Sequence, residues 1–214
     1  MIKRIKKSNL LISILVLIGG LFIILISRIT YAYFGFEIKD GNAIDIDVLS
    51  SSVDRLDFDN GDALSLIVTS TTLGQNVGNL ETISYPKASL IANNETNLAT
   101  YNYNVLLTLS NNTFTYTTQN NIPEIMLTVI DPEGVEVTSI EGLSYSTIGG
   151  VSGFDVTTYN GDINIVSNYE ILSNSSTEKT EHIWTVKLTY INLATDQSNN
   201  LGKNLTTQLL LEKS

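Results

Sequence analysis

The stretch Tyr101–Ser110, which reads YNYNVLLTLS, decides the fold class of this 214-residue chain. Every second side chain in it is apolar, beginning with Tyr101 and ending with Leu109, and polar side chains occupy most of the positions between them. Because successive side chains of a β-strand point to opposite faces, this period of two predicts a strand with one face in the core and the other in water.

The same period recurs along the chain. It is clear in 125–130 and 184–191, and no stretch beyond position 33 has a sustained helical period. Shorter strand-like runs lie at Leu64–Thr69, Ala88–Ala92, Thr113–Thr118, Val135–Ile140, Phe154–Thr158, Ile163–Val166 and Leu205–Leu211. A set of about ten strands predicts an all-β protein, an antiparallel β-sandwich of the jelly-roll type, preceded by one N-terminal hydrophobic helix.

Turn-forming residues separate these runs. Asp131-Pro132-Glu133-Gly134 is typical of a type I turn, since proline fixes φ at the second position and glycine is favoured at the fourth. We expect this turn to join the strand that ends at Ile130 to Val135–Ile140 as a hairpin. Asn60-Gly61 and Asn160-Gly161 are dipeptides that accept positive φ angles readily, so turns are expected there too.

Composition narrows the chemistry available to the chain. Charged residues make up 16% of the sequence, below the usual quarter. The lack of Cys excludes a disulfide framework and a thiolate zinc site. His182 is the single histidine, so two imidazoles cannot hold one zinc ion, and there is no His-Glu-x-x-His motif. We assign no catalytic residue, cofactor or metal ligand.

An apolar segment lies near the N-terminus. Residues 10–26 are almost entirely apolar, and residues 1–9 before them carry four basic side chains. In lipid every backbone polar group must be paired within its own segment, so we expect a helix of about 26 Å at 1.5 Å per residue. The basic residues predict that 1–9 stay in the cytoplasm, that 10–26 contact the membrane and that 33–214 form one extracellular domain.

The end of the N-terminal segment, 10–32, allows two predictions. Thr30 and Ala32 place small residues at −3 and −1 before Tyr33, which suits cleavage of a signal peptide. Arg28 inside the cleavage region, together with the length of the apolar run, favours retention as a one-pass transmembrane helix. The domain is then either secreted or at the cell surface after cleavage, or it is extracellular and anchored in the cell membrane.

The charges are divided unevenly along the chain. Five of the 12 basic residues and none of the 22 acidic residues lie before position 33. Residues 33–214 therefore hold seven basic and 22 acidic residues, a net charge of −15. A domain this acidic repels phosphate groups, so we expect no nucleic-acid partner.

The junction Thr30-Tyr31-Ala32-Tyr33-Phe34, which closes a segment containing Gly19-Gly20, resembles that of exported proteins of the TasA and camelysin type. Gly61-Asp62 before a strand-like run is also similar to a Gly-Asp early in those domains. The resemblance implies a surface or biofilm-matrix protein of a Gram-positive bacterium, processed by a dedicated signal peptidase. The chain departs from the family pattern at Gly35-Phe36, where an acidic residue usually comes sooner than Glu37 does.

Two local clusters have the residue types of a site. Asp57–Asp62 groups oxygen donors that suit Ca²⁺, but it does not fit the EF-hand loop, and an acidic turn entering the strand at Leu64 is the favoured interpretation. Gly150–Gly153 is one residue short of the Gly-x-Ser-x-Gly elbow, and nothing in the sequence places His182 beside Ser152.

The patterns together predict an exported, non-enzymatic structural protein of the cell surface or extracellular matrix. The aromatic-rich segment Tyr33–Ile38 is strand-like, and it predicts self-association by β-strand addition to another copy. The alternative is a membrane-anchored adhesion or ligand-binding β-sandwich module, with a cell-wall or host ligand.

Overall fold

Antiparallel strands make up the regular structure of the described residues, apart from one short 3-10 helix, η1 (Ser198–Asn200). The computed structural model describes residues 54–73, 77–92, 99–173 and 178–214, all within the unit Ser52–Ser214. The strands in chain order are β1 (Arg55–Asp59), β2 (Ser65–Ile67), β3 (Leu80–Ser84), β4 (Lys87–Ile91), β5 (Thr100–Ser110), β6 (Ile125–Ile130), β7 (Tyr145–Ile148), β8 (Val151–Asp155), β9 (Gly161–Leu172), β10 (Thr180–Ile183), β11 (Thr185–Tyr190) and β12 (Asn204–Lys213). This part of the chain is all-β, as the period of two predicts.

The N-terminal predictions fall on other residues. The expected helix at 10–26, the junction at Thr30, Ala32 and Tyr33, and the strand-like segment Tyr33–Ile38 lie outside the described residues. Within the described ranges, no helix has the length and apolar character needed to cross a bilayer.

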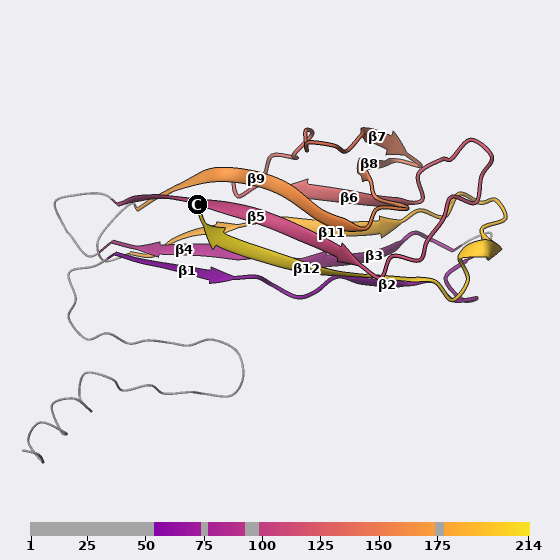
Figure 1. The fold of residues 1–214 in the computed structure, drawn as a ribbon, viewed down its shortest axis with the longest axis horizontal. Coiled ribbons are helices and arrows are strands. Elements are labelled where there is room, and N and C mark those ends of the chain that lie inside the picture. Colours follow the sequence, from indigo (N-terminus) through magenta and orange to yellow (C-terminus); the bar gives the residue numbers. More distant parts are fainter. Residues whose placement is uncertain (1–53, 74–76, 93–98, 174–177) are drawn as a thin grey trace, which may run out of the picture. The chain divides into compact units, whose positions relative to one another are not determined.

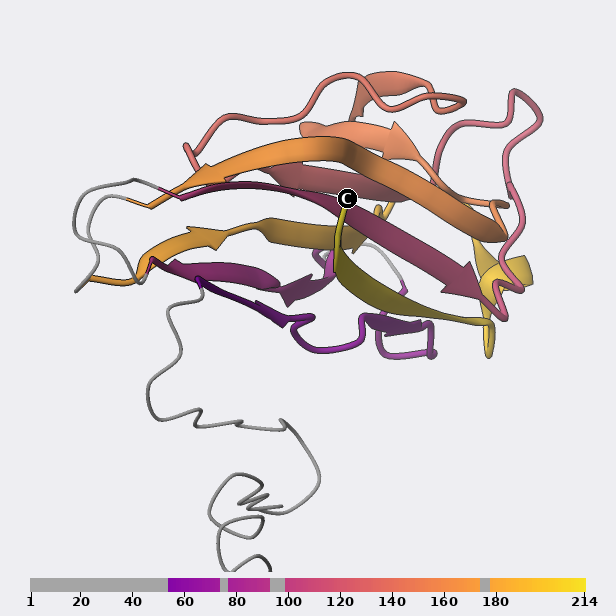
Figure 2. The ribbon, with the colours of Figure 1, turned by 60° about the vertical axis from the view of Figure 1, so that its left-hand side comes forward.

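The strands form three sheets arranged in two layers. Their orders are β1-β4-β10, β3-β11-β6-β8-β7 and β2-β12-β5-β9. The first two sheets belong to one layer because the chain continues from β3 into β4 and from β10 into β11. Strands of the third sheet cross in front of β6 and β11 in Figure 1, and Figure 2 shows the layers after a turn about the vertical axis. The fold is therefore β-sandwich-like.

Pro86 and Trp184 mark the seam between the two sheets of the larger layer. Proline has no N–H, so Pro86 cannot continue the backbone ladder from β3 into β4. Its carbonyl oxygen instead accepts a hydrogen bond from the backbone N–H of Trp184, with an N to O distance of 2.9 Å. This bond joins the two sheets of the larger layer at the point where β3 gives way to β4 and β10 gives way to β11.

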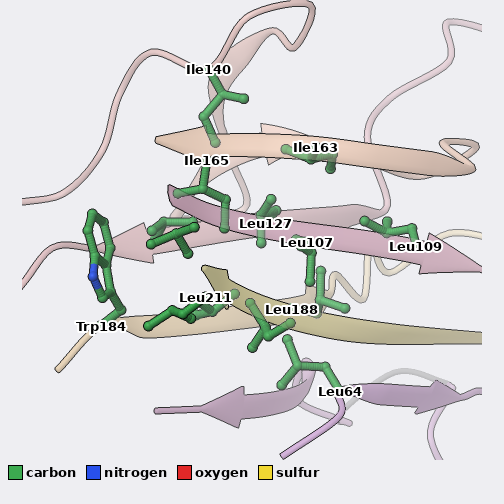
Figure 3. Close-up of a cluster of buried hydrophobic side chains, with 14 of the residues drawn as sticks. Leu64, Leu107, Leu109, Leu127, Ile140, Ile163, Ile165, Trp184, Leu188 and Leu211 are labelled. Atoms are coloured by element: carbon green, nitrogen blue, oxygen red, sulfur yellow. The ribbon is translucent and has the colours of Figure 1, made fainter. Parts of the chain in front are cut away.

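Side chains from both layers meet in one hydrophobic core. On β5 the inward positions are almost completely buried, from Tyr103 at 0% to Leu109 at 1% exposure. They belong to one cluster with Leu127 of β6 and Leu188 of β11, as Figure 3 shows for Leu109. Burial of one leucine side chain stabilises the fold by about 1.5–3 kcal/mol relative to exposure. The strand predicted from YNYNVLLTLS is thus confirmed, with its alternating burial.

The hairpin predicted at Asp131–Gly134 exists as a turn but not as a pair of strands. Gly134 N–H donates to the carbonyl oxygen of Asp131 at 3.0 Å, and Gly134 has a φ of 81°. Beyond the turn, the predicted strand Val135–Ile140 is wrong: it makes one isolated bridge, between Ile130 and Glu136. The returning chain makes two backbone hydrogen bonds beside this bridge, from Asp131 N–H to the Val135 carbonyl and from Val137 N–H to the Val129 carbonyl, each at 2.9 Å. Further along β6 this edge is occupied by β8, which pairs with Met126 and Leu127, so the hairpin ends after one bridge.

A second predicted strand, Thr113–Thr118, is also wrong. Thr113 N–H donates to the Asn204 carbonyl of β12 at 3.1 Å, but beyond it side chains bind the backbone: Thr115 N–H donates to Asn200 Oδ1, and Thr117 N–H donates to Glu124 Oε1. This irregular segment connects β5 to β6 and contributes to the site described next.

Candidate functional site

A cleft of about 400 Å³ opens where connecting segments meet the end of β8. Its lining comes from the β5–β6 connection, the β6–β7 connection and the chain around the end of β8. The lining residues are Tyr116, Gly142, Leu143, Ser144, Asp155, Thr158, Tyr159 and Asn160. The volume lies in the range of small-molecule sites, and the lining combines two aromatic rings with several polar groups.

One wall of the cleft is fixed by Tyr116 and Asp155. The Tyr116 hydroxyl donates to Asp155 Oδ2 at 2.7 Å. The other carboxylate oxygen accepts from both the backbone N–H of Thr157, at 3.0 Å, and its hydroxyl, at 2.7 Å. Burial, and then the hydrogen bond to Asp155, raise the pKa of Tyr116. The phenol therefore stays protonated near neutral pH, and its hydroxyl is held in place.

Another part of the lining is fixed by Tyr159 and Asn160. The Tyr159 hydroxyl donates to the carbonyl oxygen of Asp162 at 2.8 Å. The Asn160 amide forms two bonds to the backbone of Asn112: its oxygen accepts from the N–H at 2.9 Å, and its nitrogen donates to the carbonyl at 3.1 Å. Internal hydrogen bonds thus hold these lining side chains in place in the absence of a ligand. Gly161 after them has a positive φ of 126°, as expected for the turn at Asn160-Gly161, although Asn160 does not share it.

The buried carboxylate of Glu124 holds the segment that carries Tyr116. Glu124 is 0% exposed. Its Oε1 accepts from the backbone N–H and the hydroxyl of Thr117, each at 2.6 Å. Its Oε2 accepts from Tyr190 at 3.0 Å, and from Gln197 and Asn200 at 2.8 Å each.

These five donors are all neutral groups, so hydrogen bonds alone compensate the loss of hydration. Burial raises the pKa of Tyr190, which keeps that hydroxyl a donor. The network joins β11, η1 and the β5–β6 connection around one side chain. Its role is to anchor the wall of the cleft rather than to face a ligand.

A second polar group lies among aromatic rings away from the cleft. The Tyr103 hydroxyl accepts from Trp184 Nε1–H at 2.9 Å and contacts His182 Nδ1 at 3.1 Å. Since an indole N–H only donates, the phenolic hydrogen remains available to His182 Nδ1, which accepts it in the tautomer that carries its proton on Nε2. Burial lowers the pKa of His182, against an opposing effect of Glu133. Burial, with smaller contributions from Glu133 and Asp131, raises the pKa of Tyr169, beside Trp184, to about 12.

The acidic cluster Asp57–Asp62 does not gather its oxygens around one point. Asp57 forms an ion pair with Arg55, with an O to N distance of 2.7 Å, and Asp59 Oδ1 accepts the N–H of Gly61 at 3.0 Å. Asp57 and Asp59 also belong to β1, so the interpretation as a turn is wrong for this half of the cluster. Among the described residues, no group of three or more His, Cys, Asp or Glu side chains is placed to hold a metal ion.

Ser152 and His182 have separate partners. Ser152 Oγ lies 2.8 Å from Thr147 Oγ1 on the neighbouring strand β7. His182 instead faces Tyr103 of β5. The structure thus brings neither residue of this pair to the cleft, and the sequence patterns do not mark the lining residues of the cleft as a site.

The fold and the cleft define an all-β, β-sandwich-like protein with a preformed polar-aromatic site. No protein-family model matches this sequence, and a search of curated proteins found no match.

Proposed function

We propose that the chain is an exported, non-enzymatic structural protein of the cell surface or extracellular matrix, which self-associates by β-strand addition. A jelly-roll-like domain behind an N-terminal hydrophobic helix belongs to this proposal. The basic-then-apolar start of the chain and the resemblance of the Thr30–Phe34 junction to the TasA and camelysin type support export. The acidic composition of 33–214 argues against nucleic acid as a partner.

The observation that carries self-association is the long edge strand β9. It has twelve residues, Gly161–Leu172, and among the described strands it stands at the end of its sheet and pairs with β5 alone. An edge strand presents unpaired backbone groups to any strand that approaches, and proteins commonly protect such edges with Pro or Lys. β9 contains neither residue, but it carries Asp162 and Glu170 and its pairing with β5 is irregular around Asn168, which has a φ of 57°. The part of the edge proposed to accept a strand is therefore Gly161–Val166. The segment Tyr33–Ile38 of another copy has the length and the aromatic side chains to pair along it.

The test compares the full-length chain with the double variant Phe34→Asp, Phe36→Asp. Charged side chains weaken strand addition to an edge, so oligomers of the native chain are expected to disappear in the variant. Light scattering across a range of concentrations measures both. If the native chain is also monomeric throughout, the proposal is wrong.

Cross-linking locates the acceptor strand. The chain has no Cys, so each introduced cysteine reports on one position. A Phe36→Cys chain mixed with an Asn164→Cys chain is expected to give a mixed disulfide dimer on oxidation. Tyr85→Cys, at an exposed position near the end of β3, is the matched control and is expected to give none. Equal cross-linking to both positions would contradict pairing along β9.

The cleft favours a second candidate function, a membrane-anchored adhesion or ligand-binding module. Its walls are held by internal hydrogen bonds, which lowers the entropy lost when a ligand binds. This function predicts saturable binding of a ligand by the monomeric protein.

A further inference from the structure

We infer that the cleft lined by Tyr116 and Tyr159 binds a neutral carbohydrate, a short stretch of an oligosaccharide chain. The inference rests on ligand binding, the second candidate function, and is independent of self-association. The cleft unites flat aromatic surface, hydrogen-bonding groups and negative charge, and each of these features restricts the ligand.

The aromatic surface suits a sugar ring. Tyr116 and Tyr159 both line the cleft, and both hydroxyls donate inward, to Asp155 and to the Asp162 carbonyl. Neither side chain can swing away about χ1 without losing its bond. The face of an aromatic ring is electron-rich, and the C–H groups on one side of a pyranose carry partial positive charge, so the two surfaces attract each other.

The polar groups between the rings suit sugar hydroxyls. Ser144 and Thr158 are exposed hydroxyl side chains in the lining, and a hydroxyl group both donates and accepts. Asp155 adds carboxylate oxygens that accept. A ligand with alternating donors and acceptors around a compact apolar face matches this arrangement, and pyranose rings have this character.

Charge excludes anionic ligands. The eight described lining residues include Asp155 but no Lys, Arg or His. Glu141 and Asp162 flank the lining in the sequence. Phosphorylated or carboxylated ligands are therefore repelled. A cationic side chain stacked on the tyrosines is the remaining rival. A guanidinium or ammonium group only donates hydrogen bonds, whereas the exposed hydroxyls of Ser144 and Thr158 both donate and accept, which favours the neutral sugar.

Calorimetric titration of the purified full-length chain with cellotetraose, chitotetraose and maltotetraose tests the inference. Saturable binding of at least one sugar is expected below about 10 mM, the weak end of specific sites. No saturable heat with any of the three overturns it. Saturation by the peptide Gly-Arg-Gly, with none by the sugars, also overturns it but leaves ligand binding as a function. Self-association is measured separately by light scattering, so the outcome of that test does not change the interpretation of the sugar titration.

Variants place the sugar in the cleft. Tyr159→Ala is expected to weaken binding at least about tenfold, whereas Tyr159→Phe keeps the ring and stays within about threefold. Ser144→Arg is a second test, since a long side chain from this exposed position fills the cleft and pairs with Asp155. Tyr85→Ala removes an exposed tyrosine outside the cleft and is expected to change nothing. Native affinity in both Tyr159→Ala and Ser144→Arg overturns the assignment.

Discussion

Tyr103 and Trp184 join the two layers of the fold through a hydrogen bond of 2.9 Å, in which the indole N–H donates to the phenolic oxygen. The tyrosine belongs to β5 of one layer, and the tryptophan lies between β10 and β11 of the other. Both side chains are at most 1% exposed, so water is not available as a replacement partner.

Tyr103→Phe is expected to lower the free energy of unfolding by about 2 kcal/mol. The ring remains, but the buried Trp184 N–H loses its acceptor and His182 loses its donor. Denaturation by urea, followed by tryptophan fluorescence, measures the change. Tyr85→Phe, at a side chain that is 58% exposed, is the control and should leave the midpoint unchanged. Equal midpoints for both variants would show that the buried bond contributes nothing.

Stability is expected to fall as the pH drops below about 6.5. Burial lowers the pKa of His182 from 6.5, so the unfolded chain binds a proton in a range where the folded protein does not. The loss begins near the unfolded value and levels off below the folded one. The carboxyl groups of Glu181 and Asp196, whose pKa values are lowered from 4.5 and 3.8, act below this window.

His182→Gln isolates the histidine contribution. Glutamine retains an acceptor for the Tyr103 hydroxyl but does not titrate. Melting temperatures of native chain and variant, measured between about pH 7.5 and about pH 5, should diverge as the pH falls, with the smaller decrease in the variant. Parallel curves would contradict a contribution from His182.

Glu124→Gln is expected to destabilise the protein by about 3 kcal/mol. The amide nitrogen of glutamine is a donor, and it would face the donors of Thr117 or those around Tyr190. At least one buried donor then loses its acceptor, and the remaining bonds lose the assistance of the negative charge. Thermal unfolding measures the effect. Glu170→Gln, on the exposed side of β9, is the matched control. The same loss in both variants would argue against the network as an anchor.

Gly61→Ala is expected to cost about 3 kcal/mol. A Cβ atom at Gly61 meets Ser84 Oγ at 2.5 Å, and the backbone has a φ of +68°, which disfavours any residue with a side chain. Gly78→Ala is the matched control, because nothing lies within 4 Å of its Cβ. In the double variant with Ser84→Ala, part of the stability should return, since the hydroxyl that blocks the Cβ is gone. Chemical denaturation measures the free energy of unfolding of the native chain, the two single glycine variants and the double variant. If the double variant is no more stable than Gly61→Ala, the strain comes from the backbone alone.

The sequence predicts those strands whose two faces differ in chemistry. β5, β6, β11 and β12 each bury a regular apolar row, so their period of two is visible. β1 (RLDFD) and β10 (TEHI) have no fully buried position, and their pattern resembles a polar loop. Thr113–Thr118 has the composition of a strand, but side chains accept most of its backbone hydrogen bonds. Some of these side chains come from residues far away in the chain, so the local sequence does not reveal them.

The cleft has no local signal in the sequence. Tyr116 and Tyr159 come from separate connections, and each is oriented by a carboxylate or carbonyl group whose position the fold decides. Glu124, which anchors one of these connections, is indistinguishable in the sequence from a solvated glutamate. Its five donors come from segments up to 76 residues away, so only the assembled sheets reveal the site.

The place of β12 has a consequence for how the protein is made. Residues 204–213 lie inside their sheet, between β2 and β5, although β2 precedes them by well over a hundred residues. A nascent chain that lacks them has no partner for β2 and an uncovered edge on β5. The sandwich therefore closes only when this strand has left the ribosome, and the proposed export, if it takes an unfolded polypeptide, would have to begin before then.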